Sequence, residues 1–213
     1  MTAVPHPVRI FRLLHIDNLP VCLQRGGLHA PNYVPNDGLQ YRIIHNVDIQ
    51  NERKLRQIPC GAGGTIHDYV AFYFGMRSPM LYVLHSGRVE GYNEGQEPLI
   101  YVVSTVEAVQ NNALRYVFSD GQGIAAYTQW YDNLNRLNEV DWATVYASNW
   151  ACSIDDMDRQ RRKQAEFLVY QSCPWSLVQE IGVFNDNVQK KVLGILQKFN
   201  VSTPVRIHRD WYY

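Results

Sequence analysis

Glu166 is the carboxylate in this sequence whose setting points most directly to chemistry. It lies inside QAEFLVY at 164–170, where the neighbours are apolar and the local pattern is that of a strand. Alternation along a strand would place Glu166 on one face with Leu168 and Tyr170, and would leave the other face to Ala165, Phe167 and Val169. A carboxylate in such a strand lies either on a solvated sheet edge, the commoner case, or in a cleft.

Two basic clusters could hold a polyanion near this carboxylate. The first comes directly before Glu166 and consists of Arg159, Arg161, Arg162 and Lys163. The second consists of Arg53, Lys54 and Arg56, which could supply phosphate contacts and a catalytic cation. Three aromatic residues precede the first cluster in the chain: Trp142, Tyr146 and Trp150. Aromatic faces interleaved with basic residues are what stacking on single-stranded nucleic acid requires, although solvated loops and core packing are the commoner uses of these residue types.

Other familiar motifs are weak or missing. The stretch CGAGGT at 60–65 lacks the GK[ST] ending of a phosphate loop and does not match GxGxxG. The His and Cys positions show no metal-ligand spacing, so no metal site is predicted. The cysteines Cys22, Cys60, Cys152 and Cys173 form no CxxC pair, which favours reduced thiols. His15 follows an apolar run, where a histidine is more often part of the core than functional.

The strands and helices that must position these groups follow one another in no regular order. Apolar runs predict strands at 8–16, 69–74, 80–85, 99–103, 165–170 and 181–184, with a last strand and an aromatic tail within 205–213. Apolar residues spaced by three and four predict helices at 124–134 and 188–199, and a short helix begins at Asp17 or Asn18. Without a regular βαβ alternation, the pattern favours an α+β fold.

Composition limits the number of domains and the classes of function further. A chain of 213 residues that is 46% hydrophobic and 19% charged predicts one compact domain over 1–213. The 20 Lys and Arg balance the 20 Asp and Glu, so nucleic-acid binding must come from local clusters, and a protein that coats polyanions is excluded. No run of about 18 apolar residues and no signal-peptide pattern is seen, which predicts a cytoplasmic protein without a membrane association.

Several segments together resemble one family, the DarT-type DNA ADP-ribosyltransferase toxins. In chain order they are HIDNLP at 15–20, DIQNERKLRQI at 48–58, DYVAFYFGMRSPMLY at 68–82, SDGQGIAAYT at 119–128 and DRQRRKQAEFLVY at 158–170. The resemblance covers nearly the whole chain, and the combination of RSPMLY after an FYF strand with RRKQAEFLVY is far more specific than any single motif.

The resemblance implies the ADP-ribosyltransferase fold, with two packed central β-sheets, flanking helices and an NAD cleft between the sheets. It implies an enzyme that transfers ADP-ribose from NAD+ to a base of single-stranded DNA, most often thymine, without a metal. It further implies a toxin of a toxin-antitoxin system, neutralised by a DarG-like macrodomain antitoxin. We expect a monomer, in which an insert at about 30–58 covers the NAD+ and a substrate loop at about 140–164 binds the DNA.

Residue roles follow from the same resemblance. Glu166 matches the catalytic glutamate and Arg53 the catalytic arginine, which also lies near the NAD+, although Arg56 is close enough in sequence to exchange places with it. His15, Asn18 and Tyr73 match NAD-binding positions, with Tyr69 and Tyr82 as competitors for the role of Tyr73. The expected DNA contacts are Arg56, Trp150, Arg159 and Arg162.

Three other functions stay open on the sequence. The same chemistry could modify guanine or an RNA end, because loop side chains choose the acceptor. The fold could also serve as a non-catalytic nucleic-acid-binding module. Transfer to a protein ranks lowest, because it would leave the basic and aromatic loop without a role.

Overall fold

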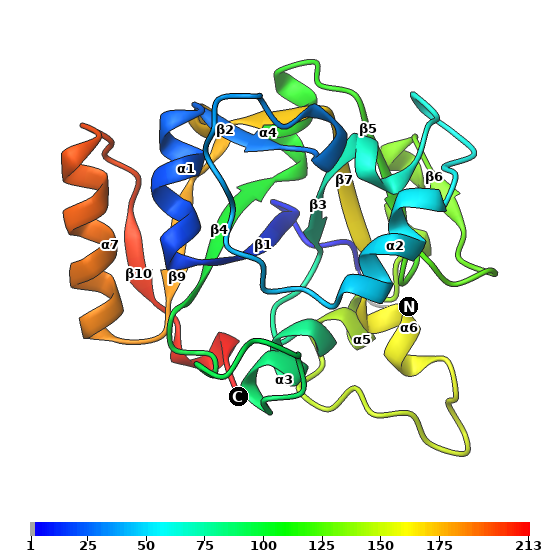
Figure 1. Ribbon diagram of the computed structural model, residues 1–213. Coiled ribbons are helices and arrows are strands. Elements are labelled where there is room, and N and C mark those ends of the chain that lie inside the picture. Colours follow the sequence, from blue (N-terminus) through cyan, green and yellow to red (C-terminus); the bar gives the residue numbers. More distant parts are fainter. Residues whose placement is uncertain (1–2) are drawn as a thin grey trace.

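The structure is a computed structural model that describes residues 3–213. Eight strands form one mixed sheet in the order β10-β9-β4-β1-β3-β7-β5-β6 (Figure 1). Their bounds are β1 (Arg9–His15), β3 (Tyr69–Tyr73), β4 (Leu99–Thr105), β5 (Tyr116–Ser119), β6 (Trp130–Tyr131), β7 (Glu166–Tyr170), β9 (Glu180–Val183) and β10 (Val205–Ile207). A second, small sheet pairs β2 (Gly27–His29) with β8 (Ser172–Pro174).

The large sheet consists of two halves that separate at its centre. β1 pairs with β4 over seven residues and β3 pairs with β7 over five. Between β1 and β3, however, the only register pair is Phe11 with Tyr73. The predicted α+β class is confirmed, and the two expected central sheets are the two halves of one hydrogen-bonded sheet that divides between β1 and β3.

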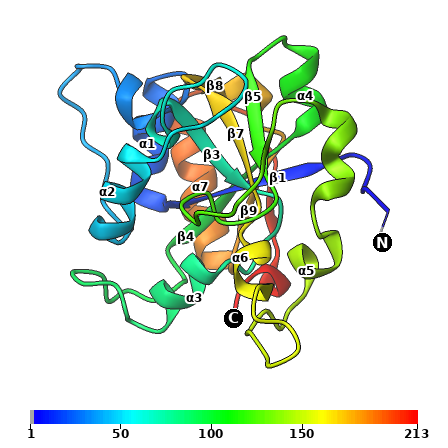
Figure 2. The ribbon, with the colours of Figure 1, turned by 90° about the vertical axis from the view of Figure 1, so that its right-hand side faces the viewer.

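Seven helices surround these strands: α1 (Leu19–Gln24), α2 (Val47–Leu55), α3 (Pro79–His85), α4 (Val106–Asn111), α5 (Trp142–Tyr146), α6 (Arg159–Lys163) and α7 (Asp186–Lys198). α7 lies along β10 at one edge of the molecule, whereas Figure 2 places α2, α3 and α6 around β3 and β7. Across residues 3–213, no helix has both the length and the apolar character needed to cross a bilayer.

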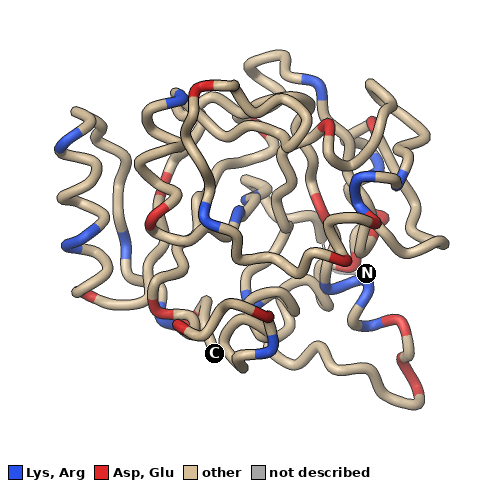
Figure 3. Tube along the Cα trace, viewed as in Figure 1, with Lys and Arg blue, Asp and Glu red and all other residues tan. Residues whose placement is uncertain are grey.

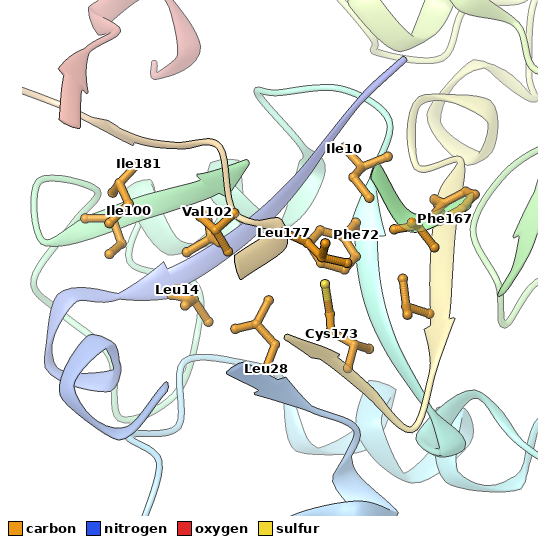
Figure 4. Close-up of a cluster of buried hydrophobic side chains, with 14 of the residues drawn as sticks. Ile10, Leu14, Leu28, Phe72, Ile100, Val102, Phe167, Cys173, Leu177 and Ile181 are labelled. Carbon is orange, nitrogen blue, oxygen red and sulfur yellow. The ribbon is translucent and has the colours of Figure 1, made fainter. Parts of the chain in front are cut away.

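The core occupies both faces of the central strands. Figure 4 shows its main cluster, which includes Ile10 and Leu14 of β1, Phe72 of β3, Val102 of β4 and Phe167 of β7. Along β7 the expected alternation is confirmed. Ala165, Phe167 and Val169 join this main cluster, while Leu168 and Tyr170 pack in a separate cluster on the other face.

Two sequence predictions of secondary structure are wrong. The strand expected at 80–85 is helix α3, because Ser78 caps it by accepting a hydrogen bond from Leu81 N at 3.2 Å and Pro79 occupies the first turn. The helix expected at 124–134 is a series of turns followed by β6, which pairs with β5. Its apolar residues face different surroundings: Tyr131 stacks on Phe118, whereas Tyr127 is 63% exposed.

Candidate active site

Glu166 begins β7, an interior strand between β3 and β5, and its side chain is 2% exposed. The edge-strand alternative is therefore wrong. The carboxylate accepts hydrogen bonds from Arg53 Nη1 at 2.9 Å, from Arg53 Nη2 at 2.7 Å and from the backbone N–H of Gly123 at 3.1 Å. Three hydrogen bonds from these donors to one buried carboxylate hold it in a fixed orientation.

Arg53 reaches Glu166 from α2, which lies in the insert and buries none of its own side chains. Burial disfavours the charge of its guanidinium, but the charge and hydrogen bonds of Glu166 outweigh burial and raise the pKa of Arg53. Arg56 faces elsewhere, since its Nη2 donates to the carbonyls of Ala125 at 3.1 Å and Ala126 at 3.3 Å. Of the two arginines that the sequence left open, Arg53 is the one that lies against Glu166.

Tyr73 on β3 is the direct register partner of Glu166. Burial, and then the charge of Glu166, raise the pKa of Tyr73 to about 12, so its phenol stays neutral at physiological pH. The competitor Tyr69 also lies on β3, but its hydroxyl already donates to the carbonyl of Gly63 at 2.8 Å. Tyr82, the second competitor, lies on α3.

A cavity of about 620 Å³ opens where the two half-sheets separate. Its walls include Arg12, Asn18, Arg53, Tyr73, Gln122 and Glu166. The insert supplies much of the remaining wall, from residues 39–46 and from α2. A cavity of this size that brings a carboxylate and several cations together can take a ligand of dinucleotide class.

Two of the predicted NAD-binding residues differ in their placement. His15 is buried but does not line the cavity: its Nδ1 accepts from the backbone N–H of Asp17 at 3.2 Å, and burial, then Arg42, lower its pKa. Asn18 lines the cavity, and both the oxygen and the nitrogen of its side-chain amide form hydrogen bonds with the insert. Its Oδ1 accepts from Arg42 N at 2.6 Å, and its Nδ2 donates to Arg42 O at 2.9 Å. Asn18 therefore holds the backbone of the insert against the cavity wall.

Arg12 on β1 is a cavity residue that the sequence analysis missed. Its Nη1 donates to the carbonyl of Ala71 at 2.7 Å, which ties β1 to β3 where the ladder between them is open. Its Nε is buried without a partner in the described chain, and burial lowers the pKa of the guanidinium. The available signal was a charged residue inside the apolar run at 8–16, the same signal that singled out Glu166.

Three of the four predicted DNA contacts, Trp150, Arg159 and Arg162, lie together in α6 and the loop before it, whereas Arg56 lies at the end of α2. Trp150 Nε1 donates to Tyr213 Oη at 2.6 Å, and Arg159 Nε donates to Asn149 O at 3.1 Å. Arg162 is engaged by aspartates, with Nη2 at 2.6 Å from Asp156 and Nη1 at 3.2 Å from Asp141. Figure 3 shows acidic and basic segments side by side along this part of the chain. Arg162 is therefore largely neutralised within the protein.

Comparison with known proteins decides the family. A family model described as "ssDNA thymidine ADP-ribosyltransferase, DarT" matches residues 11–213. The chain belongs to the DarT family. It is accordingly a DNA ADP-ribosyltransferase, as the resemblance of its motifs predicted.

Relatives of known activity match over nearly their full length. A DNA ADP-ribosyl transferase of Thermus sp. (strain 2.9) is 41% identical over 211 residues, covering 98% of each protein. One of Escherichia coli O127:H6 is 33% identical over 209 residues, covering 98% of this chain and 95% of the relative.

Solved DarT structures share the fold. "Thermus sp. 2.9 DarT in complex with ADP-ribosylated ssDNA" superposes with a TM-score of 0.93 at 40% identity, covering 100% of this chain and 99% of that one. The same enzyme in complex with NAD+ gives a TM-score of 0.89 at 39% identity, covering 99% and 100%. The fold of this chain is therefore the DarT fold.

Proposed function

We propose that this protein transfers ADP-ribose from NAD+ to a thymine of single-stranded DNA, with the cavity at the sheet division as the donor site. The observation that carries the proposal is the Arg53–Glu166 pair, a buried carboxylate bound by a half-buried guanidinium in one cavity wall. The Thermus relatives bound to NAD+ and to ADP-ribosylated single-stranded DNA support it.

NAD+ is the ADP-ribose donor. Its pyrophosphate needs cations, and Arg12 is a cavity guanidinium to which the described chain gives no carboxylate partner. Tyr73 and Asn18 line the same cavity and are our candidates for contacts to the nicotinamide end. His15 is proposed as a support of this wall, because it packs behind it rather than lining it.

The proposed reaction breaks the bond between C1′ of the ribose and the nicotinamide nitrogen. Nicotinamide leaves as a neutral molecule, so the chemistry needs no metal. The ribose carries the positive charge that develops, and Glu166 is positioned to stabilise it through the carboxylate and by holding a ribose hydroxyl. To do so it must share its oxygens between Arg53 and the donor.

The acceptor nitrogen of thymine belongs to an imide, which is a poor nucleophile until its proton leaves. A guanidinium beside it stabilises the negative charge that develops on the ring, and we assign this role to Arg53. The new bond joins this nitrogen to C1′ and the imide proton is released. The insert at about 30–58 would cover the donor and keep out water that would hydrolyse NAD+.

We propose Trp150, Arg159 and Arg162 of the substrate loop at about 140–164, together with Arg56 at the end of α2, as contacts to the DNA. Arg159 is the better phosphate ligand of the two loop arginines, because its aspartate partner Asp156 lies 3.7 Å away, whereas that of Arg162 lies at 2.6 Å. Local binding by a few cations on a chain of zero net charge would be salt-sensitive and short in footprint.

A chain that modifies DNA bases would act as a toxin. We propose that it works in the cytoplasm as a monomeric single domain, neutralised by a macrodomain antitoxin of the DarG type. Expression in a host strain should arrest DNA synthesis, and a co-expressed macrodomain should restore growth. Growth at the normal rate under verified expression would contradict the toxin role.

The acceptor is tested with single-stranded oligonucleotides that differ only in one base. We expect an adduct on strands with thymine and none when thymine is replaced by any other base. Adducts that follow guanine, or that form on RNA ends, would move the assignment to the second candidate acceptors. Binding of the strands with no adduct under any condition would favour the non-catalytic nucleic-acid-binding module.

A further inference from the structure

The loop at 120–129 connects β5 to β6 and contains most of the SDGQGIAAYT motif. It brings a backbone group to the carboxylate of Glu166, since the N–H of Gly123 donates to Glu166 Oε1 at 3.1 Å. Gln122, the preceding residue, lines the cavity. A Cβ on Gly123 would lie 3.2 Å from the same oxygen, so a residue with a side chain would crowd the carboxylate. The position of this loop therefore decides how Glu166 is held.

Arg161 of α6 fastens both ends of this loop. Its Nη1 donates to Asp120 Oδ1 at 2.7 Å, at the start of the loop, and to Thr128 Oγ1 at 3.3 Å, near the end. The backbone carbonyl of Arg161 accepts from the N–H of Gln122 at 3.0 Å. The guanidinium also packs against Gly121, where an added Cβ would collide with it. One residue thus holds the loop at both ends and in between.

The charge of Arg161 is satisfied within the protein. Its Nε and Nη2 each donate to Asp158 at 2.8 Å, and Nη2 also donates to Asp120 at 3.2 Å. Its side chain is 10% exposed. Two carboxylates around one guanidinium leave little charge to attract a further anion. Arg161 is therefore placed to support the loop rather than to bind a phosphate.

The peptide unit between Gln122 and Gly123 carries this support to the carboxylate. Thr128 Oγ1 donates to its carbonyl at 2.7 Å, and its N–H donates to Glu166 Oε1. A trans peptide is planar, with the C=O and the N–H on opposite sides, so fixing the carbonyl also fixes the direction of the N–H. Hydrogen bonds in series also strengthen one another. Arg161, Thr128 and this peptide thus form a chain of hydrogen bonds that ends on Glu166.

This chain of hydrogen bonds acts on one of the two oxygens of Glu166. Oε1 accepts from Gly123 N and from Arg53 Nη1 at 2.9 Å, which occupies both of its lone pairs. Among residues 3–213, Oε2 accepts only from Arg53 Nη2, at 2.7 Å. Oε2 therefore keeps one lone pair for a hydroxyl group.

We propose that Arg161 and Thr128 are positioning residues, which hold Glu166 Oε1 through the peptide between Gln122 and Gly123 and so leave Oε2 to accept a hydrogen bond from a ribose hydroxyl of NAD+. The inference rests on the proposed function, which assigns the donor ribose to Glu166. Positive charge develops on this ribose only in the transition state. Loss of the orientation should therefore slow transfer more than it weakens the binding of NAD+.

Thr128→Val and Thr128→Ser form a matched pair, because valine keeps the shape of threonine without the hydroxyl and serine keeps the hydroxyl. In single-turnover transfer at saturating NAD+, we expect Thr128→Val to lower the rate constant roughly 5-fold. The NAD+ concentration that gives half the maximal rate should stay that of the wild type. Thr128→Ser should keep the wild-type rate constant, as should the control Thr105→Val, which removes a buried hydroxyl from β4. A wild-type rate in Thr128→Val, or equal losses in Thr128→Val and Thr128→Ser, would overturn the inference.

Arg161→Gln tests the other end of the chain of hydrogen bonds. We expect roughly 10-fold slower transfer, and the double variant with Thr128→Val should lose little more than Arg161→Gln alone, because both act through one peptide. The affinity for a single strand and its salt dependence should stay unchanged. Losses that multiply in the double variant would show independent roles and overturn the chain. Weaker, less salt-dependent strand binding in Arg161→Gln would show a phosphate contact and also overturn it.

The proton chemical shift of the Gly123 amide tests the same chain of hydrogen bonds without NAD+ or DNA. In Thr128→Val this resonance should move upfield, because its hydrogen bond to Glu166 weakens, whereas Thr128→Ser and Thr105→Val should keep it in place. An unmoved resonance in Thr128→Val would overturn the inference whatever the activity. A moved resonance in a protein that modifies no strand would contradict the proposed function and still support Arg161 and Thr128 as the residues that orient Glu166.

Discussion

Arg53 and Glu166 form a two-bond ion pair, at 2.9 and 2.7 Å, across 113 positions of sequence. The pair joins an interior strand of the sheet to a helix that buries none of its side chains. The same contact therefore assembles the proposed catalytic groups and fastens the insert over the cavity.

Glu166→Gln tests both consequences of this pair. We expect ADP-ribosyl transfer to fall by about 10²–10³-fold, because the developing positive charge loses its carboxylate. Hydrogen exchange in α2 should accelerate without any ligand, because a neutral amide holds Arg53 more weakly. Glu180→Gln is the control: Glu180 is also buried and ion-paired, to Arg206 at 3.0 Å, but on β9. Equal acceleration of α2 exchange in both variants would contradict the fastening role.

Asn18→Ala should loosen the insert next to the cavity. It removes two hydrogen bonds to the backbone of Arg42, worth about 1 kcal/mol each, so the KM for NAD+ should rise by roughly 10-fold. Exchange of residues 39–46 should also accelerate in the absence of NAD+. Asn112→Ala, which removes a bond within the α4 region, serves as the control. Unaltered exchange without ligand would mean that Asn18 does not clamp the insert.

Gly123→Ala tests how precisely the Glu166 carboxylate must be positioned for ADP-ribosyl transfer. A Cβ at this position would lie 3.0 Å from Ile66 Cδ1 and 3.2 Å from Glu166 Oε1, so Gly123→Ala should shift the carboxylate that we propose as catalytic by a few tenths of an ångström. We expect kcat to fall by about 10-fold with little change in folding, measured by single-turnover transfer. Gly194→Ala has open space around it in α7 and should raise stability by about 0.5–1 kcal/mol, with wild-type kcat. Wild-type kcat in Gly123→Ala would refute this requirement.

The free energy of unfolding should fall at acidic pH, because two histidines that line the cavity, His45 and His67, become protonated. Burial comes first in lowering the pKa values of His45 and His67 below 6.5, and the charge of Arg53 adds to it. The neutral rings are then favoured in the folded state, so their stability contribution is present above pH 6.5 and is lost as pH falls below it. Urea unfolding at pH 7.5 and 5.5 should show this loss. The double substitution His45→Gln with His67→Gln should reduce the pH dependence, and an unchanged dependence would contradict the assignment.

The sequence predicts the elements that local pattern determines. The alternation around Glu166 predicted β7 and its two faces. Successive side chains of a strand point to opposite faces of the sheet, and in an interior strand both sets pack against apolar neighbours. The motifs predicted Arg53 near the donor, although only the fold brings α2 to β7.

What the sequence could not predict depends on contacts between distant segments. The run at 80–85 is apolar enough for a strand, and the cap at Ser78 with Pro79 decides for a helix. The two hydrogen bonds of Asn18 join its side-chain amide to the backbone N–H and carbonyl of Arg42, and backbone partners leave no signal in the sequence. Arg12 carried the same signal as Glu166, a charge inside an apolar run, but its position between two half-sheets can be recognised only once the sheet is known to divide there.

The most direct test of the central claim is intact-mass analysis of a thymine-containing single strand incubated with NAD+ and the protein, beside Glu166→Gln. The proposed function predicts one added ADP-ribose with the wild type and almost none with the variant. An unmodified strand in the presence of wild-type protein and NAD+, or equal adduct from both proteins, would contradict it.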